Sequence, residues 1–149
     1  MTVDKIEQTI ELPFAQERVW RAITSPEELS KWFGDEITLK RAVGSDIHFL
    51  WHEHGASSGI VEVYDPPNHF AYRWRATGVS EEEPLAPDNS TLVTFTLTPT
   101  AEGTRLELVE TGFASLPEAK RETAYQGNTE GWQSELAELV EYLEEGSGE

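Results

Sequence analysis

The sequence predicts an α+β fold in which a curved antiparallel sheet wraps around a long C-terminal helix. Between residues 35 and 111 apolar side chains recur with a period of two, in segments separated by glycine and proline. Residues 117–145 instead show the spacing of an amphipathic helix, with a break expected near Gly127. Consecutive strands with short connections imply an antiparallel meander, and the helix must bury its apolar stripe against it.

The segment before this sheet contributes one strand and two short helices. Residues 5–12 alternate as a strand, and residues 16–23 carry an apolar stripe at helical spacing. A second helix follows at once, because Ser25 offers an N-cap hydroxyl, Pro26 suits the first helical position and Glu28 completes a capping box. The apolar face of this second helix consists of Leu29, Trp32 and Phe33.

The period-two region divides into six expected strands. Their ranges are 36–40, 46–52, 58–64, 69–75, 91–98 and 104–111. The stripe of the final helix that should face these strands consists of Trp132, Leu136, Leu139, Val140 and Leu143.

Composition excludes several classes of function. The chain has 149 residues, the size of one domain, and a formal net charge of −17. Such a charge repels phosphate backbones and anionic lipid surfaces, so we expect neither nucleic-acid nor membrane binding. No signal segment or membrane-spanning apolar run is recognisable, and cysteine is absent, so a cytoplasmic location is expected.

Several segments together point to a known family. These are residues 19–29, 31–34, 62–63, 65–67, 104–106, 111–113 and 131–132, together with Tyr72 and Trp74. In this order they resemble the START-like superfamily and, within it, the family named after the activator of the heat-shock protein 90 ATPase. The resemblance spans residues 3–143. It implies a helix-grip fold in a single START-like domain, which we place at residues 1–145. The closing residues 146–149 are themselves expected to form a disordered tail.

The resemblance also implies an apolar cavity between the sheet and the last helix. Strand alternation places bulky aromatic side chains on one face of several strands, opposite Trp132. The predicted lining consists of Phe49, Trp51, Val61, Val63, Tyr72, Trp74, Phe95, Tyr125, Trp132 and Leu136. The alternative is that these rings simply fill a solid core.

The sequence offers no catalytic residue, cofactor site or metal site. No Gly-x-Ser-x-Gly elbow is present. His48, His52 and His54 alternate along one stretch, but His48 and His52 would stand roughly 13 Å apart on a strand, too far to share an ion. Glu62 and Glu110 are carboxylates that could act in a cavity, although neither has a recognisable partner in the sequence.

Three functions from different classes remain open. The first is non-catalytic binding of an apolar or aromatic small molecule in the cavity, by a protein that we expect to be a monomer. The second is a protein–protein module, such as a chaperone accessory or stress-response protein, which an exposed apolar patch would favour. The third is an enzyme acting on polyketide-like or aromatic substrates, which a strongly shifted carboxylate or histidine in the cavity would favour.

Overall fold

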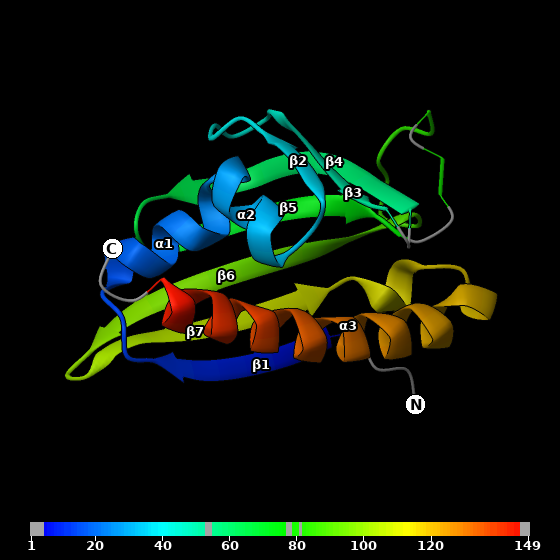
Figure 1. The fold of residues 1–149 in the computed structure, drawn as a ribbon. Helices are drawn as coiled ribbons and strands as arrows, with labels where there is room; N and C mark the ends of the chain where they lie inside the picture. Colours follow the sequence, from blue (N-terminus) through cyan, green and yellow to red (C-terminus); the bar gives the residue numbers. More distant parts are fainter. Residues whose placement is uncertain (1–4, 53–54, 77–78, 81, 147–149) are drawn as a thin grey trace.

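The structure, a computed structural model, describes residues 5–52, 55–76, 79–80 and 82–146 (Figure 1). Seven strands, three α-helices and one 3₁₀ turn follow one another along this part of the chain. In order they are β1 (Lys5–Leu12), α1 (Gln16–Thr24), α2 (Pro26–Trp32), β2 (Glu36–Leu39), β3 (Asp46–Trp51), β4 (Gly55–Asp65), β5 (His69–Arg75), β6 (Ser90–Thr100), β7 (Gly103–Thr111), η1 (Phe113–Ser115) and α3 (Glu118–Glu145).

The seven strands form one antiparallel sheet in the order β1-β7-β6-β5-β4-β3-β2. Strands β2 to β7 are therefore a simple meander, whereas β1 pairs with the last strand, Lys5 opposite Thr111 and Leu12 opposite Thr104. The sheet, the two short helices after β1 and the long final helix confirm the predicted α+β helix-grip fold.

All three helices pack on the same face of the sheet. Figure 1 shows α3 running along the β1–β7 side while α1 and α2 cover the other half of that face. The apolar stripe of α3 is buried through Trp132, Leu136, Leu139 and Leu143. No helix in the described part of the chain has the length and apolar character needed to cross a membrane.

The final helix continues through Gly127, so the expected break there was wrong. One glycine in a helix interior costs only about 1 kcal/mol relative to alanine. Packing on both sides of it is sufficient to offset that cost, because Tyr125 contacts Phe113 before the glycine and Trp132 is buried after it.

A β-bulge in β4 changes which of its side chains face the helices. The pairing with β5 runs from Val61 opposite Tyr72 directly to Val63 opposite Ala71, so one residue of β4 is extra. Because side chains alternate between faces, this extra residue puts Val61 inside and Val63 outside. Val61 is fully buried, whereas Val63 is 39% exposed, so the prediction that Val63 lines the interior was wrong.

The junction of α1 and α2 differs from the expected capping box. Ser25 is the N-cap of α2, but its hydroxyl donates to the carboxylate of Glu27 and makes no capping bond to the backbone. Glu28 is turned away from Ser25, toward α1 and α3.

Glu28 joins the three helices through its carboxylate. Arg18 and Arg21 of α1 donate to its two oxygens at 2.7 and 2.6 Å, and the hydroxyl of Tyr142 of α3 donates at 2.8 Å. Burial alone would raise the pKa of Glu28, but these hydrogen bonds outweigh it and lower the pKa. The carboxylate therefore ties the α1–α2 pair to the C-terminal half of α3.

Candidate functional site

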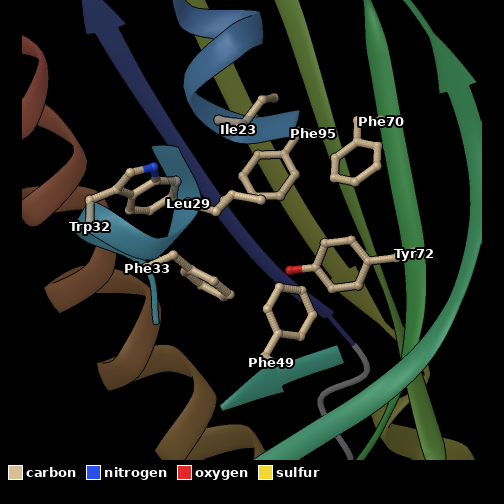
Figure 2. A pocket seen from close by; sticks show the side chains of 8 residues that line it. All are labelled: Ile23, Leu29, Trp32, Phe33, Phe49, Phe70, Tyr72 and Phe95. Carbon is tan, nitrogen blue, oxygen red and sulfur yellow. The ribbon is translucent and has the colours of Figure 1, made fainter. Parts of the chain in front are cut away.

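A small void lies in the core between the α1–α2 pair and the sheet (Figure 2). Its volume is about 10 Å³, room for roughly one water molecule. One wall comes from α1, α2 and the residue after α2, and the other comes from β3, β5 and β6. The lining residues are Ile23, Leu29, Trp32, Phe33, Phe49, Phe70, Tyr72 and Phe95.

The hydroxyl of Tyr72 is the polar group of this void. Figure 2 shows it pointing toward the middle of the ring cluster, between Phe33 and Phe49. Tyr72 is only 2% exposed, and its hydroxyl makes no hydrogen bond with a described residue. Burial first, and then the charges of Glu110 and Glu135, raise the pKa of this hydroxyl well above its ordinary value. The oxygen borders the void, so a molecule in the void can hydrogen-bond to it.

Three stacked rings separate the void from a second, polar feature. Phe33 stacks on Trp132 with centroids 5.4 Å apart, and Trp132 stacks on Trp74 at 5.8 Å. Tyr72 meets Trp74 edge-on at 5.2 Å. The indole N–H groups of both tryptophans point to the same carboxylate, that of Glu110.

Glu110 is a carboxylate with no exposed surface, held by four neutral donors. Its Oε2 accepts hydrogen bonds from the Trp74 indole at 3.0 Å, the Thr91 hydroxyl at 2.5 Å and the Asn128 amide at 2.9 Å. Its Oε1 accepts from the Trp132 indole at 2.8 Å. The carboxylate therefore links strands β5, β6 and β7 to helix α3.

The sequence of β7 directs Glu110 inward. Thr104, Leu106, Leu108 and Glu110 alternate with side chains that are exposed or half-buried, so all four face the helices. Glu110 is the only charged member of that inward row. Placing it there is costly unless hydrogen bonds compensate, which the four donors do.

Glu135 is a second carboxyl group on the inner side of α3. It follows Trp132 by three residues and Asn128 by seven, so the three side chains share one face of the helix. Its Oε2 is buried and has no hydrogen-bond partner among the described residues. Burial, and to a lesser extent the charge of Glu138, raise the pKa of Glu135 to about 8.

This shift makes the stability of the protein depend on pH. Because the folded-state pKa of Glu135 is raised above 4.5, its ordinary value, the folded state holds the proton more tightly than the unfolded state. The stabilisation that comes from this tighter proton binding is fully present at low pH and is lost as the pH rises through about 8. We expect Glu135→Gln to gain about 1–2 kcal/mol in unfolding free energy relative to wild type between pH about 5 and about 9, allowing for solvent screening of a partly exposed group.

Urea denaturation at several pH values measures this difference. Glu141→Gln is the matched control, because it removes the same charge from the exposed side of the same helix. A difference in unfolding free energy between wild type and Glu135→Gln that does not change with pH would contradict the raised pKa of Glu135.

The structure brings most of the predicted lining residues together, but not all of them. Phe49, Tyr72 and Phe95 border the void. Trp51 and Trp74 contact Phe33 from the sheet, Trp132 contacts it from α3, and Val61 and Leu136 are buried in the same core. Tyr125 instead packs against Phe113 and is not part of the void.

The prediction missed the half of the wall that comes from the short helices. Ile23, Leu29, Trp32 and Phe33 were expected in the helices' apolar faces, but not as lining. Thr91 and Asn128, which hold Glu110, carried no recognisable signal. The strand alternation of β7 was the one signal that could have identified Glu110 as an inward-facing carboxylate.

The described residues contain no group of three or more His, Cys, Asp or Glu side chains able to hold a metal ion. Of the three histidines considered above, His54 lies outside the described residues. The ring of His52 lies 3.3 Å from the carboxylate of Glu36, at the surface.

Solved structures similar to this chain share its fold over nearly its full length. Protein MLL2253 from Mesorhizobium loti is 25% identical, with a TM-score of 0.79, and the match covers 95% of this chain and 97% of that one. DynU16, a protein of the dynemicin biosynthetic locus, is 24% identical with a TM-score of 0.78, over 97% of this chain but 48% of its own. The Aha1 dimer from Colwellia psychrerythraea is 20% identical with a TM-score of 0.77, over 98% of this chain and 100% of that one.

A comparison with curated proteins finds no match. The family profile described as Activator of Hsp90 ATPase homolog 1-like protein, in contrast, matches residues 13–144, which run from the end of β1 to the last turn of α3. The chain belongs to this family.

Proposed function

We propose that the protein binds an apolar or aromatic small molecule between the sheet and the helices, without catalysis. The observation that carries the proposal is the Tyr72 hydroxyl, which is buried, faces the void and lacks a hydrogen-bond partner among the described residues. A ligand that hydrogen-bonds to this hydroxyl would satisfy it, while the surrounding rings would contribute apolar contact.

A ligand larger than water must displace side chains, because the void holds only about 10 Å³. The two walls belong to separate units, the α1–α2 pair and the sheet, so a small movement of the pair enlarges the space. This movement strains several contacts. The Tyr142 hydroxyl of α3 donates to Glu28, the Trp51 indole donates to the Phe33 carbonyl at 2.6 Å, and the Gln16 amide of α1 donates to the carbonyl of Leu97 at 3.1 Å.

The other two hypotheses have less support. Among the described residues, the large hydrophobic side chains that are exposed are Val43 and Val63. Two valines do not form the patch of several hundred Å² that marks a protein interface. The raised pKa of Glu135 favours the enzyme hypothesis, but one carboxyl group without a nucleophile or a positioned partner does not define a reaction.

Tyr72→Phe is the decisive variant. Because the hydroxyl has no partner in the described structure, its removal should leave the stability unchanged or slightly higher. Titrating naphthalene-methanol into the protein should shift the indole N–H resonances of Trp32, Trp74 and Trp132 saturably in proton–nitrogen NMR spectra. In Tyr72→Phe the affinity should fall about fivefold, the value of one hydrogen bond.

Tyr64→Phe serves as the matched control, since Tyr64 lies on the neighbouring strand, contacts Trp20 and Phe70, and does not itself line the void. Its affinity for the probe should equal that of wild type. Linear, non-saturating shifts in wild type would reject the interior site, and equal affinities of wild type and Tyr72→Phe would reject Tyr72 as its polar anchor.

A further inference from the structure

The α1–α2 pair is held together as one unit. Glu28 of α2 accepts hydrogen bonds from Arg18 and Arg21 of α1 at 2.7 and 2.6 Å. The Trp32 indole of α2 donates to the carbonyl of Ala22 in α1 at 2.9 Å. The side chains of Arg18 and Glu28 are only 15% and 14% exposed, so water weakens their ion pair less than it would weaken a fully exposed one. The two helices can therefore move together without losing the contacts between them.

Hydrogen bonds attach this unit to the rest of the protein at three places. Where the chain enters α1, the Gln16 amide donates to the carbonyl of Leu97 in β6. Where the chain leaves α2, the carbonyl of Phe33 accepts from the Trp51 indole of β3. The third place is the junction of the two helices, where Glu28 meets α3. Because the first two attachments lie at the ends of the unit, the junction is the part that can swing while both of them are kept.

The junction also covers the void. Ile23, near the end of α1, and Leu29, in α2, lie on either side of the junction, and both line the void. The opposite wall is the sheet, which contributes Phe49, Tyr72 and Phe95. A swing that carries the junction away from the sheet therefore enlarges the void.

Tyr142 of α3 holds the junction by two contacts. Its hydroxyl donates to Glu28 at 2.8 Å, and the guanidinium carbon of Arg18 lies over its ring, 5.5 Å from the centroid. A charged acceptor strengthens the first contact, and a cation over an aromatic face is attracted to it. Figure 1 shows the C-terminal end of α3 beside α1. Because both contacts end on the same side chain, an outward swing of the junction breaks them together.

We infer that Tyr142 is a latch that keeps the α1–α2 pair closed over the interior site and sets how readily a ligand enters. The inference rests on the ligand site proposed above and concerns the regulation of that site. In the closed form the latch holds the void at about 10 Å³. In the ligand-bound form the junction has moved outward, both contacts with Tyr142 are broken, and the ligand fills the enlarged space. The affinity is therefore reduced in proportion to the fraction of molecules whose latch is closed.

Tyr142→Phe tests the latch, because it removes the hydrogen bond to Glu28 and keeps the aromatic ring. We expect this variant to bind naphthalene-methanol about fivefold more tightly than wild type in the NMR titration, although its thermal midpoint falls. The bound form lacks the latch, so the gain should appear in the association rate, measured by stopped-flow tryptophan fluorescence, with the dissociation rate unchanged. A tyrosine that only stabilises the fold would not tighten binding when it is altered.

Tyr125→Phe is the matched control, since Tyr125 lies on the same helix but packs against Phe113. Its affinity and both rates should equal those of wild type. The latch is overturned if wild type binds the probe saturably and Tyr142→Phe binds it equally or more weakly, or if both variants gain affinity alike. Failure of wild type and both variants to bind the probe would instead reject the proposed ligand site, on which the latch depends.

Discussion

Replacing Glu110 with alanine should destabilise the protein by about 4–5 kcal/mol, the largest effect that we expect from a single substitution. The substitution removes the acceptor of four hydrogen bonds. The Trp132 indole and the Thr91 hydroxyl are buried, so each is left with an unsatisfied hydrogen-bonding group when the carboxylate is removed. Three strands and α3 lose their common contact at the same time.

Urea denaturation monitored by circular dichroism gives the unfolding free energy. Glu110→Gln keeps one acceptor oxygen and should lose less than Glu110→Ala. Glu107→Ala, three residues earlier on β7 with an exposed side chain, should change the stability by less than about 0.5 kcal/mol. A loss below about 1 kcal/mol for Glu110→Ala would mean that the carboxylate is not held as described.

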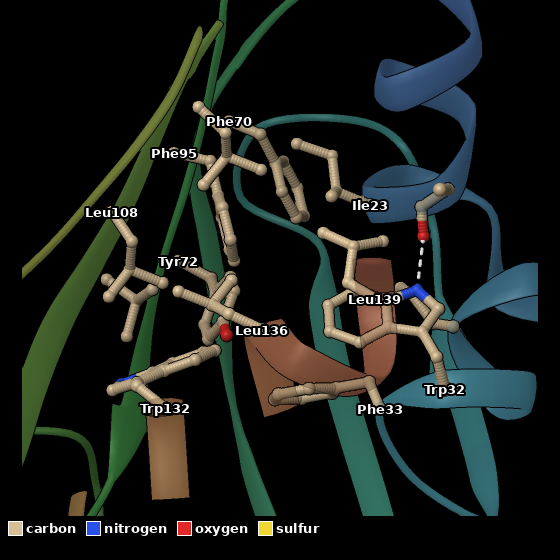
Figure 3. Packing of buried hydrophobic residues seen from close by; sticks show 14 of the residues in the cluster. Ile23, Trp32, Phe33, Phe70, Tyr72, Phe95, Leu108, Trp132, Leu136 and Leu139 are labelled. Carbon is tan, nitrogen blue, oxygen red and sulfur yellow. Dashed lines mark hydrogen bonds between the residues drawn. The ribbon is translucent and has the colours of Figure 1, made fainter. Parts of the chain in front are cut away.

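Trp32→Ala should cost about 3–5 kcal/mol, as for other large truncations of a core aromatic residue. Trp32 is 5% exposed, packs against Phe33 and donates its indole N–H to the carbonyl of Ala22 at 2.9 Å (Figure 3). The substitution therefore enlarges the void and also breaks a tie between α1 and α2.

The neighbouring Lys31→Ala is the control, since its side chain is exposed on the same helix and alanine favours helices. It should leave the thermal midpoint nearly unchanged. If Trp32→Ala retained wild-type stability, α2 could not be packed against the sheet as Figure 3 shows.

The fold was largely predictable because its periodic patterns are long. The strands at residues 5–12 and 69–75 were predicted with their observed bounds, and the other strands and α3 agree to within a few residues. The errors have local causes. The bulge beside Glu62 moves Val63 to the outer face, and the sequence of β4 contains no residue pattern that would have predicted this bulge.

The site was less predictable, because tertiary contacts decide it. Alternation identified Tyr72, Phe49 and Phe95 as inward-facing, but it could not tell a void from a filled core. The lining from α1 and α2 depends on how those helices dock, which periodicity does not reveal. Glu28 illustrates the limit: its position fits a capping box, yet the arginines of α1 and Tyr142 compete successfully for its carboxylate.

The position of β1 has a consequence for how the chain acquires its fold. Strands β2 to β7 each pair with a sequence neighbour, so they can assemble progressively, hairpin by hairpin. Strand β1 can pair only after β7 has formed, because its partner is the last strand of the sheet: Lys5 pairs with Thr111. Closing so long a loop is entropically costly, and pairings between residues far apart in the sequence slow folding. On the ribosome, β1 therefore emerges first and is among the last strands to find its partner.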